Sequence, residues 1–488
     1  MLFHSIDFVI FFPIVVMAYF ILPKKLKNVW LLVASYYFYM NWNAKYALLL
    51  FGASLITYLA SFAVSRMAEN KRGRQWVLAG ALVLVFAILA YFKYVNFALQ
   101  SVVGVVNAFG STLQIPEFDI ILPVGISFFT FQAAGYLIDV YRGEVELERN
   151  PITYFLFVSF FPQLVAGPIE RSKNLLQQMH TTYQWDRKRI ERGLCIMLWG
   201  YFLKLVLADR CAVLVDSIFR IYPEHHGLLL ILGAILFSLQ IYFDFMGYST
   251  IARGAALVLG YRLMDNFHQP YFATSIKEFW RRWHISLSTW FRDYLYIPLG
   301  GNRCSKGRKY FNLMVTFLVS GLWHGANWTF VIWGGIHGLY QVIGDLLAPV
   351  LAKIRKVCRV REEATSFIIF RIVRTDILAV IAWVFFRAET ITGACNYLKN
   401  CVTGGLELEA VWGDAFYTYG LNEWHMNLLL IGLVVFFIFS FLRERGVAVL
   451  NWVYSQGVVL RYIIYWALVI LIIFSLDLSG QEFIYFQF

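Results

Sequence analysis

The stretch WVLAGALVLVFAILAYFKYVNF, residues 76–97, decides the class of fold. Its only charged side chain is Lys93, and it exceeds the roughly 18 apolar residues that a helix needs to span a bilayer. Residues 227–247, GLLLILGAILFSLQIYFDFMG, repeat the pattern with one acid, Asp244. The two stretches predict an integral membrane protein with bilayer-spanning helices.

Composition extends this prediction to the whole chain. Of its 488 residues, 60% are hydrophobic and 15% charged, against roughly 45–50% and about 25% in soluble proteins. The net charge of +12 could indicate nucleic acid binding, but the Lys and Arg side chains lie in short loops between apolar segments, where they mark the cytoplasmic side. We therefore expect membrane lipid as a partner, and no nucleic acid. The six cysteines form no C-x-x-C pair, so neither disulfides nor a metal site is indicated.

Apolar runs between basic loops predict an all-α polytopic protein, a single membrane domain over 1–488 with about 11–14 transmembrane or re-entrant helices. Residues 1–23 lack a basic stretch before the apolar run, so we expect a retained helix and not a signal peptide. The stretch 98–120 is left unassigned. The predicted spans are 6–22, 29–42, 46–65, 76–97, 121–141, 151–166, 193–208, 227–247, 310–323, 327–348, 366–386, 426–442 and 459–476.

The charged loops predict the orientation of the chain. The basic loops 24–27 and 353–361 belong in the cytoplasm, whereas the loop 402–425 carries four acids and neither Lys nor Arg, as expected of an external loop. Alternating the spans from these loops places both the N-terminus and the tail 477–488 on the outer face.

His324, in GLWHGANW, is the first candidate for chemistry. Apolar residues precede and follow it, and an ionisable side chain at membrane depth is a functional hypothesis by default. The alternative is a neutral, hydrogen-bonded packing histidine. Gly321 and Gly325 flank it, so a substrate or a neighbouring helix could approach closely. For His337, in WGGIHG, and His268, before a proline, packing or loop roles are expected.

The segment 277–303, KEFWRRWHISLSTWFRDYLYIPLGGNR, spaces its aromatic residues like an amphipathic helix at the membrane interface. That role does not explain His284. Nor does it explain the ending IPLGGNR, where Asn302 and Arg303 beside two glycines could meet an anionic ligand from the cytosol.

Polar residues also interrupt three other apolar segments. Gln132 in LPVGISFFTFQ and Gln163 in FFPQLVAGPIER mark either cavity walls or helix kinks without a ligand. Asp244 in IYFDFMGYS is a buried acid, with Arg253 as one possible partner, and either structural pairing or catalysis would explain it.

In chain order, these motifs resemble those of the bacterial membrane-bound O-acyltransferases, in the branch of membrane proteins for alginate and peptidoglycan O-acetylation. The motifs span about 122–338, and the start FHSIDFVIFF is also similar. The resemblance implies tilted helices around a central funnel in a bacterial cytoplasmic membrane. It further implies acetyl-CoA as a donor that enters from the cytosol, with no bound cofactor.

The resemblance identifies His324 as the catalytic histidine and His284 as the second histidine of the family's motifs. A neutral imidazole suits the removal of a hydroxyl proton near pH 7, and an apolar surround keeps the ring uncharged. The residues predicted to line the funnel or the donor site are Trp283, Arg281, Arg282, Trp323, Asn327, Gln132, Gln163, Asp244, Asn302 and Arg303.

The aromatic end of the tail, QEFIYFQF, resembles the ends of family members whose tyrosine is a proposed acyl carrier, which here is Tyr485. A phenol has a pKa of about 10, so its ester retains transfer potential. The alternative is an aromatic membrane anchor.

The resemblance also implies a partner. The chain shows no evident external domain that could grip a polymer, so an exported acetyltransferase of the serine-hydrolase-like type is expected to reach the glycan polymer. Two other functions compete with acyl transfer. One is a membrane transporter or channel, which predicts internal repeats that the sequence does not show; the other is a structural scaffold of a glycan-export complex.

Overall fold

The computed structural model describes residues 1–110, 112–165, 167–476 and 483, and every regular element in this part of the chain is helical. The all-α prediction is therefore confirmed. The chain divides into two compact units: unit 1 comprises Met1–Met197 with Tyr248–Met264, and unit 2 comprises Leu198–Gly247 with Asp265–Phe488. The single domain over 1–488 stays a prediction.

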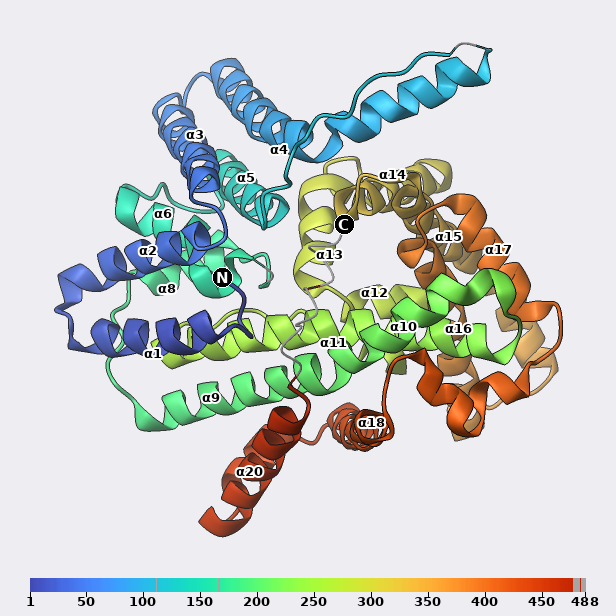
Figure 1. Ribbon diagram of the computed structural model, residues 1–488. Helices are drawn as coiled ribbons and strands as arrows, with labels where there is room; N and C mark the ends of the chain where they lie inside the picture. The colour runs from blue at the N-terminus through green and yellow to red at the C-terminus, as the bar shows by residue number, and fades with distance from the viewer. Residues whose placement is uncertain (111, 166, 477–482, 484–488) are drawn as a thin grey trace. The chain divides into compact units, whose positions relative to one another are not determined.

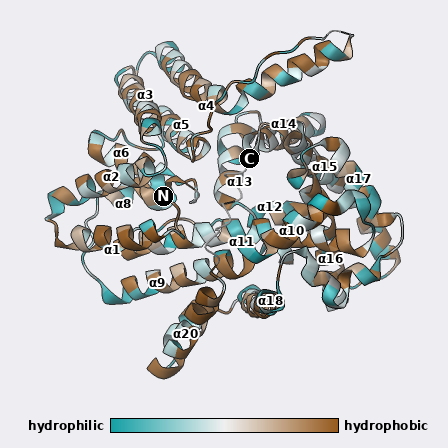
Figure 2. Ribbon diagram, viewed as in Figure 1, coloured by the Kyte–Doolittle hydropathy of each residue, from teal (hydrophilic) through white to brown (hydrophobic). Residues whose placement is uncertain are grey.

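Five helices are long and apolar enough to cross a membrane, which confirms a multi-pass membrane protein. They are Ala44–Arg66, Lys71–Ala108 (α4), Leu228–Leu259 (α11), Trp328–Val357 (α15) and Glu423–Glu444 (α18). Shorter apolar helices cover Ile6–Ile21 (α1), Pro151–Leu164 and Val458–Phe474 (α20). Figure 2 shows hydrophobic residues along the length of α20, and none of them is buried, as expected of a helix that contacts lipid. The full count of 11–14 spans stays a prediction.

Unit 1 is built around α3 (Ala47–Arg66), which packs most extensively against α4 and against α5 (Ile126–Arg142), as the upper left of Figure 1 shows. α4 runs for 38 residues, so it includes the predicted span 76–97 and also the first part of the unassigned stretch 98–120. The remaining helices of the unit are α2 (Lys24–Met40), α3 (Ala47–Arg66), α5 (Ile126–Arg142), α6 (Pro151–Ser159), α7 (Phe161–Leu164) and α8 (Gln177–Met179), with parts of α9 (Arg187–Tyr201) and α11.

Unit 2 centres on the hairpin of α14 (Lys306–His324) and α15, which is the most extensive helix pairing in the described chain (Figure 1). Two glycines let the backbones of this hairpin touch. A Cβ at Gly321 would lie 2.2 Å from the carbonyl oxygen of Phe330, and one at Gly334 would lie 2.2 Å from that of Phe317. The close approach expected beside His324 is thus made by a neighbouring helix, and it fixes the end of α14.

The other helices of unit 2 surround a larger core, and two of them, α12 (Ile276–Arg282) and α16 (Thr365–Arg387), pack against this hairpin. The remaining ones are α10 (Asp209–Ile221), α13 (Ile285–Phe291), α17 (Ile391–Val402), α19 (Val449–Ser455) and the parts of α9 and α11 that belong to this unit. Two described stretches of unit 2 have the wider π-helical turn, Phe202–Ala208 (η3) and Arg292–Tyr296 (η6), as does Ser172–Leu176 (η2) in unit 1.

The prediction of one amphipathic interfacial helix over 277–303 is wrong. The segment breaks between α12 and α13, turns through η6 and ends in an irregular loop. Its aromatic side chains Trp280, Trp283 and Phe291 are buried and do not form an exposed membrane-facing stripe. Their three- to four-residue spacing reflects packing inside the protein, because the break turns both short helices inward.

Candidate active site

His324 is the last residue of α14, at the point where the hairpin turns toward α15. Its side chain is only 4% exposed. Aromatic rings surround it: the ring centroids of Trp323 and Trp333 each lie 5.0 Å away, and that of Phe386 lies 5.4 Å away. The imidazole therefore lies in an apolar pocket formed by α14, α15 and α16.

His284 lies at the break before α13 and is fully buried. Its backbone is left-handed, with φ 42° and ψ 54°, a conformation that costs a residue other than glycine about 1–2 kcal/mol. Asn266 holds the turn, since its carbonyl oxygen accepts the Ile285 N–H (2.9 Å) and its Oδ1 accepts the Ser286 N–H (3.3 Å). The fold thus maintains a strained turn that orients one histidine.

The two predicted catalytic histidines come together in unit 2. Their ring centroids are 6.3 Å apart, and the ring of Trp323 lies beside both, at 6.0 Å from His284 and 5.0 Å from His324. On its other side His284 contacts Phe245 of α11, at 4.5 Å between centroids. Residues 40 positions apart in sequence therefore form one histidine pair in an aromatic surround.

Burial keeps His284 in the uncharged form. His284 lies outside the five helices that could cross a membrane, and desolvation lowers its pKa to about 3, so the ring is neutral at physiological pH. Among the described residues, neither ring nitrogen of His284 has a hydrogen-bond partner. A buried polar group without a partner is costly, so these nitrogens are suited to meet a bound ligand.

His337 provides a contrast within the same hairpin. It is also fully buried, but its Nδ1 accepts a hydrogen bond from Trp280 Nε1 (3.2 Å) and its ring packs against Trp333 at 5.1 Å. This is the packing role that was expected for it. Next to it, Trp283 stacks on Phe279 at 5.4 Å and forms part of the same aromatic core.

Comparison with known proteins identifies the family. The family model "MBOAT, membrane-bound O-acyltransferase family" matches residues 148–385, a range that includes both histidines. The "Probable alginate O-acetylase AlgI" of Pseudomonas aeruginosa is 41% identical over 384 residues, which cover 78% of this chain and 71% of that protein. The chain belongs to the membrane-bound O-acyltransferase family.

Two further relatives define the branch. The "Peptidoglycan O-acetyltransferase" of Helicobacter pylori is 35% identical over 423 residues, 80% of this chain and 78% of that protein. The "Teichoic acid D-alanyltransferase" of Bacillus subtilis is 29% identical over 238 residues, 46% of this chain and 59% of that protein. The branch expected from the motifs is thereby confirmed, and the protein is a multi-pass membrane O-acyltransferase.

A buried ion cluster of this acyltransferase was missed by the sequence reasoning. Lys204, which is 1% exposed and lies in the π-turn η3, contacts Asp244 at 2.7 Å and Asp209 at 2.8 Å. Lys204 is thus a partner of Asp244 that the sequence did not suggest, and the possible pairing of Asp244 with Arg253 stays a prediction. Next to the cluster, the guanidinium of Arg210 donates to the Ser475 carbonyl oxygen, directly before the tail.

Several residues predicted for the donor site have structural partners instead. Arg282 donates to both carboxylate oxygens of Glu444, at 2.7 and 3.0 Å, and to Glu278 at 2.7 Å. Asn327 caps α15 through the Thr329 N–H (3.0 Å) and donates to the Glu389 carbonyl oxygen (3.0 Å). The side chains of Arg281, Asn302 and Arg303 are exposed, and Asn302 accepts from the Tyr296 hydroxyl. Their roles toward a donor stay predictions.

The two glutamines form a pair in unit 1. Gln163 Nε2 donates to Gln132 Oε1 (3.0 Å), and both side chains donate to the Phe157 carbonyl oxygen. These bonds fix the irregular end of α6, which is the helix-kink role, one of the two alternatives that the sequence left open.

Tyr485 lies outside the described residues. Phe483, two positions earlier, is described: its ring is fully buried and lies 6.3 Å from that of Phe245, the residue that contacts His284. A residue of the tail thus packs on the same aromatic surround as the histidine pair.

Proposed function

We propose that this enzyme transfers an acetyl group from cytosolic acetyl-CoA across the bacterial cytoplasmic membrane for O-acetylation of an exported glycan. The observation that carries the proposal is the buried pair of His284 and His324 inside the region that the family model matches, in which His284 is held neutral. The names of the relatives, an alginate O-acetylase and a peptidoglycan O-acetyltransferase, support an acetyl group and a glycan acceptor.

In the proposed reaction His324 acts as the general base. Its ring accepts the proton of an acceptor hydroxyl as the hydroxyl oxygen attacks the thioester carbonyl carbon. The carbon–sulfur bond then breaks, and the imidazolium returns the proton to the leaving thiolate. One ester and one thiol form with no net release of a proton, so a buried site without a solvent-exposed base can complete the step.

His284 has a separate proposed role. As a neutral ring it offers one N–H donor and one acceptor, and its nitrogens have no partner among the described residues. The donor nitrogen would bind the developing oxyanion of the thioester carbonyl. Desolvation supports this role, because an imidazole with a pKa of about 3 remains neutral and cannot compete with His324 for the proton.

The first acceptor that we propose is the phenol of Tyr485. The burial of Phe483 near Phe245 supports it, since a residue two positions before Tyr485 then lies in the aromatic surround of the histidine pair. In the second step a serine hydroxyl of an exported, serine-hydrolase-like partner would attack the phenyl ester, and the phenolate would regain a proton. That partner would pass the acetyl group to the glycan, with both termini of the enzyme on the outer face.

The proposal is tested by a His324→Gln variant of the full-length enzyme, assayed with radiolabelled acetyl-CoA, the partner and glycan. Loss of a general base lowers the rate by about 10²–10⁴-fold. The matched control is His268→Gln, an exposed loop histidine that should retain activity. A transporter or scaffold predicts full acetylation by the His324→Gln variant, which would refute the proposed chemistry.

The carrier step needs its own experiment. Mass spectrometry of the C-terminal peptide after incubation with labelled acetyl-CoA should find the label on Tyr485, and a Tyr485→Phe variant should carry none. A Tyr485→Phe variant that acetylates the glycan at the wild-type rate would leave the tail with an anchoring role only.

A further inference from the structure

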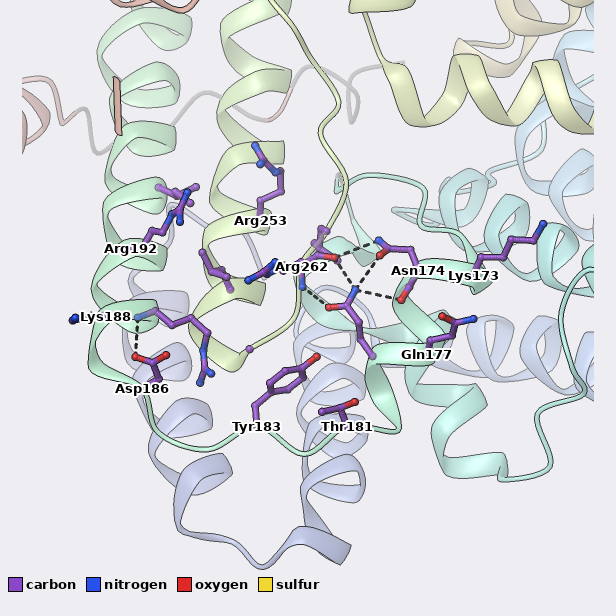
Figure 3. Close-up of a pocket in the computed structure, with 16 residues that line it drawn as sticks. Lys173, Asn174, Gln177, Thr181, Tyr183, Asp186, Lys188, Arg192, Arg253 and Arg262 are labelled. Atoms are coloured by element: carbon purple, nitrogen blue, oxygen red, sulfur yellow. Dashed lines mark hydrogen bonds between the residues drawn. The ribbon is translucent and has the colours of Figure 1, made fainter. Parts of the chain in front are cut away.

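Unit 1 contains a cavity of about 980 Å³ that the proposed chemistry does not use. Its wall is formed by the segment 173–183, by the start of α9 and by the end of α11 with the residues after it. Figure 3 shows these segments around the cavity, with Arg192 and Arg253 on one side and Asn174 and Gln177 on the other. Its volume lies within the range of about 300–1,000 Å³ that is typical of cofactor and ligand sites.

The cavity is strongly cationic. Its lining carries a single carboxylate, Asp186, against six basic side chains: Lys173, Lys188, Arg189, Arg192, Arg253 and Arg262. Lys173 is partly neutralised by Glu144 at 2.6 Å. Positive side chains gathered around one hollow repel each other, and an anion that enters it relieves this repulsion and is drawn in by the focused potential.

A network of hydrogen bonds fixes the position of Arg262. Gln178 Nε2 donates to the Arg262 carbonyl oxygen (2.9 Å), and Gln178 Oε1 accepts the Arg262 N–H (2.7 Å). Two positions later, Glu170 Oε1 accepts the Met264 N–H (2.6 Å). The segment after α11 is therefore held before any ligand binds, which lowers the entropic cost of binding.

Arg189 and Tyr183 form the second fixed element. Arg189 Nη2 donates to the Gln184 carbonyl oxygen (2.6 Å), and its guanidinium lies 5.7 Å from the centroid of the Tyr183 ring. Its Nε is buried and has no hydrogen-bond partner among the described residues. Gly260, with φ +112°, lets the ring approach, since a Cβ there would lie 2.3 Å from Tyr183 Cγ. An oriented guanidinium thus lies beside an aromatic face at the edge of the cavity.

We propose that this cavity binds the phosphate groups of the coenzyme A donor, an assignment that rests on the proposed donor. A 3′-phosphate carries about two negative charges and the diphosphate about two more at neutral pH, a charge that matches the basic lining. Arg282, which was expected at the donor site, is already bound to Glu444 and Glu278. The lining of this cavity is a better match for the phosphates.

The experiment is a calorimetric titration of the full-length enzyme in phosphatidylcholine nanodiscs with coenzyme A and with dephospho-coenzyme A. The variants are Arg189→Gln, Arg262→Gln and their combination. The matched control is Arg72→Gln, an exposed arginine of unit 1 that does not line the cavity. We expect coenzyme A to bind more tightly than dephospho-coenzyme A. The double variant should weaken coenzyme A binding at least tenfold, and Arg72→Gln should leave it unchanged. Wild-type affinity in the double variant would overturn the proposal.

A second arm separates the donor from a lipid headgroup with the same phosphate chemistry. Nanodiscs with added phosphatidylglycerol should leave coenzyme A binding intact. If phosphatidylglycerol displaces coenzyme A and its own binding needs Arg189 and Arg262, the site belongs to a lipid and the proposal fails. Thermal unfolding of each variant verifies the fold, and Arg262→Gln, at an exposed position, is the variant least disruptive to packing.

The assay of acetyl transfer distinguishes failure of this site from failure of the proposed function. The variants should raise the KM for acetyl-CoA by a larger factor than they lower kcat. If the wild type transfers acetyl from acetyl-CoA while the variants keep its KM, the cavity assignment is wrong and the enzyme's proposed function stands. If the wild type neither binds coenzyme A nor transfers its acetyl group, the proposed donor is wrong, and the cavity assignment falls with it.

Discussion

Two successive residues of α11 face two different interiors of unit 2. Asp244 lies in the charged cluster with Lys204 and Asp209, whereas Phe245 lies in the aromatic surround of His284. Consecutive residues of a helix point about 100° apart, so one turn of α11 contributes to both. Both clusters are buried, but the first holds an ammonium group between two carboxylates and the second places two histidines among aromatic rings.

The difference shows two ways to bury an ionisable group. An ion pair is stable only while each charge keeps its partner, and it is therefore a poor place for a group that must exchange protons. A neutral imidazole can accept a proton from a substrate without first leaving an ion pair. The histidine pair is thus suited to chemistry and the lysine cluster to structure, and the predictions below test that division.

The largest effect is expected from Lys204→Met, which leaves Asp209 and Asp244 buried without their ammonium group. Removal of one partner of a buried ion pair costs about 3–5 kcal/mol of folding stability. The measurement is unfolding of the purified protein by heat or denaturant in a fixed detergent.

The matched control removes all three charges at once. In the triple variant Lys204→Met, Asp209→Asn, Asp244→Asn no buried charge is left unpaired, so most of the stability should return. Equal destabilisation of the single and triple variants would mean that the cluster acts through packing and not through charge.

The sequence could predict much of this architecture because long apolar runs determine membrane helices. The predicted span 76–97 lies within α4 (Lys71–Ala108). The predicted span 227–247 covers the first part of α11 (Leu228–Leu259). The burial of His324 could be predicted from its place between two apolar runs. Its function stays a prediction, which rests on the cost of burying an ionisable residue. These signals are local, so no knowledge of the packing was required.

The features that the sequence did not predict depend on contacts between residues far apart in the chain. The left-handed turn at His284 is held by Asn266, and nothing in the order W-H-I-S indicates a break. Lys204 reaches Asp244 from a π-helical turn, whose wider register changes the direction of each side chain and is not encoded in hydrophobic spacing. The hydrophobic pattern that predicts the helices therefore does not predict which buried polar side chains contact each other.

A buried carboxyl group in unit 1, that of Glu170, extends the comparison. Its hydrogen bonds come from neutral donors, whereas Asp244 pairs with an ammonium group. Glu170 accepts from Asn174 Nδ2 and the Met264 N–H, each at 2.6 Å, and desolvation raises its pKa from 4.5 to about 7, against a smaller opposing effect of Arg253. Between pH 4.5 and 7 the folded state then holds a proton that the unfolded state has lost. Stability should therefore fall as pH rises through this window, by about 3 kcal/mol in full.

The measurement is the unfolding free energy at a series of pH values, with Glu170→Gln as the control. The glutamine has no proton to release, so the part of the slope between pH 4.5 and 7 that Glu170 contributes should vanish in the variant. A slope that is identical in both proteins would assign the pH dependence to another group.

Gly334→Ala tests the wall of the histidine pair without any change of charge. The added Cβ would meet the Phe317 carbonyl oxygen at 2.2 Å, so α14 and α15 must separate. Overpacking of this kind costs about 1–3 kcal/mol. Because His324 lies at the end of α14, acetyl transfer should fall further than stability alone explains. Gly335→Ala, where the nearest atom is a flexible Leu318 methyl at 3.4 Å, is the control that should be tolerated.

The smallest effect is expected from Asn327→Ala, which separates a capping residue from a catalytic one. Loss of an N-cap costs about 1 kcal/mol, so unfolding should shift slightly and kcat should change little. Asn327→Asp keeps the Oδ1 acceptor for the Thr329 N–H but removes the donor to the Glu389 carbonyl oxygen. The variant therefore measures the contribution of the first hydrogen bond without the second. If the aspartate variant has wild-type stability but a strongly reduced kcat, Asn327 takes part in the reaction and is not only a capping residue. Wild-type kcat in both variants would restrict the catalytic groups on this turn to His324.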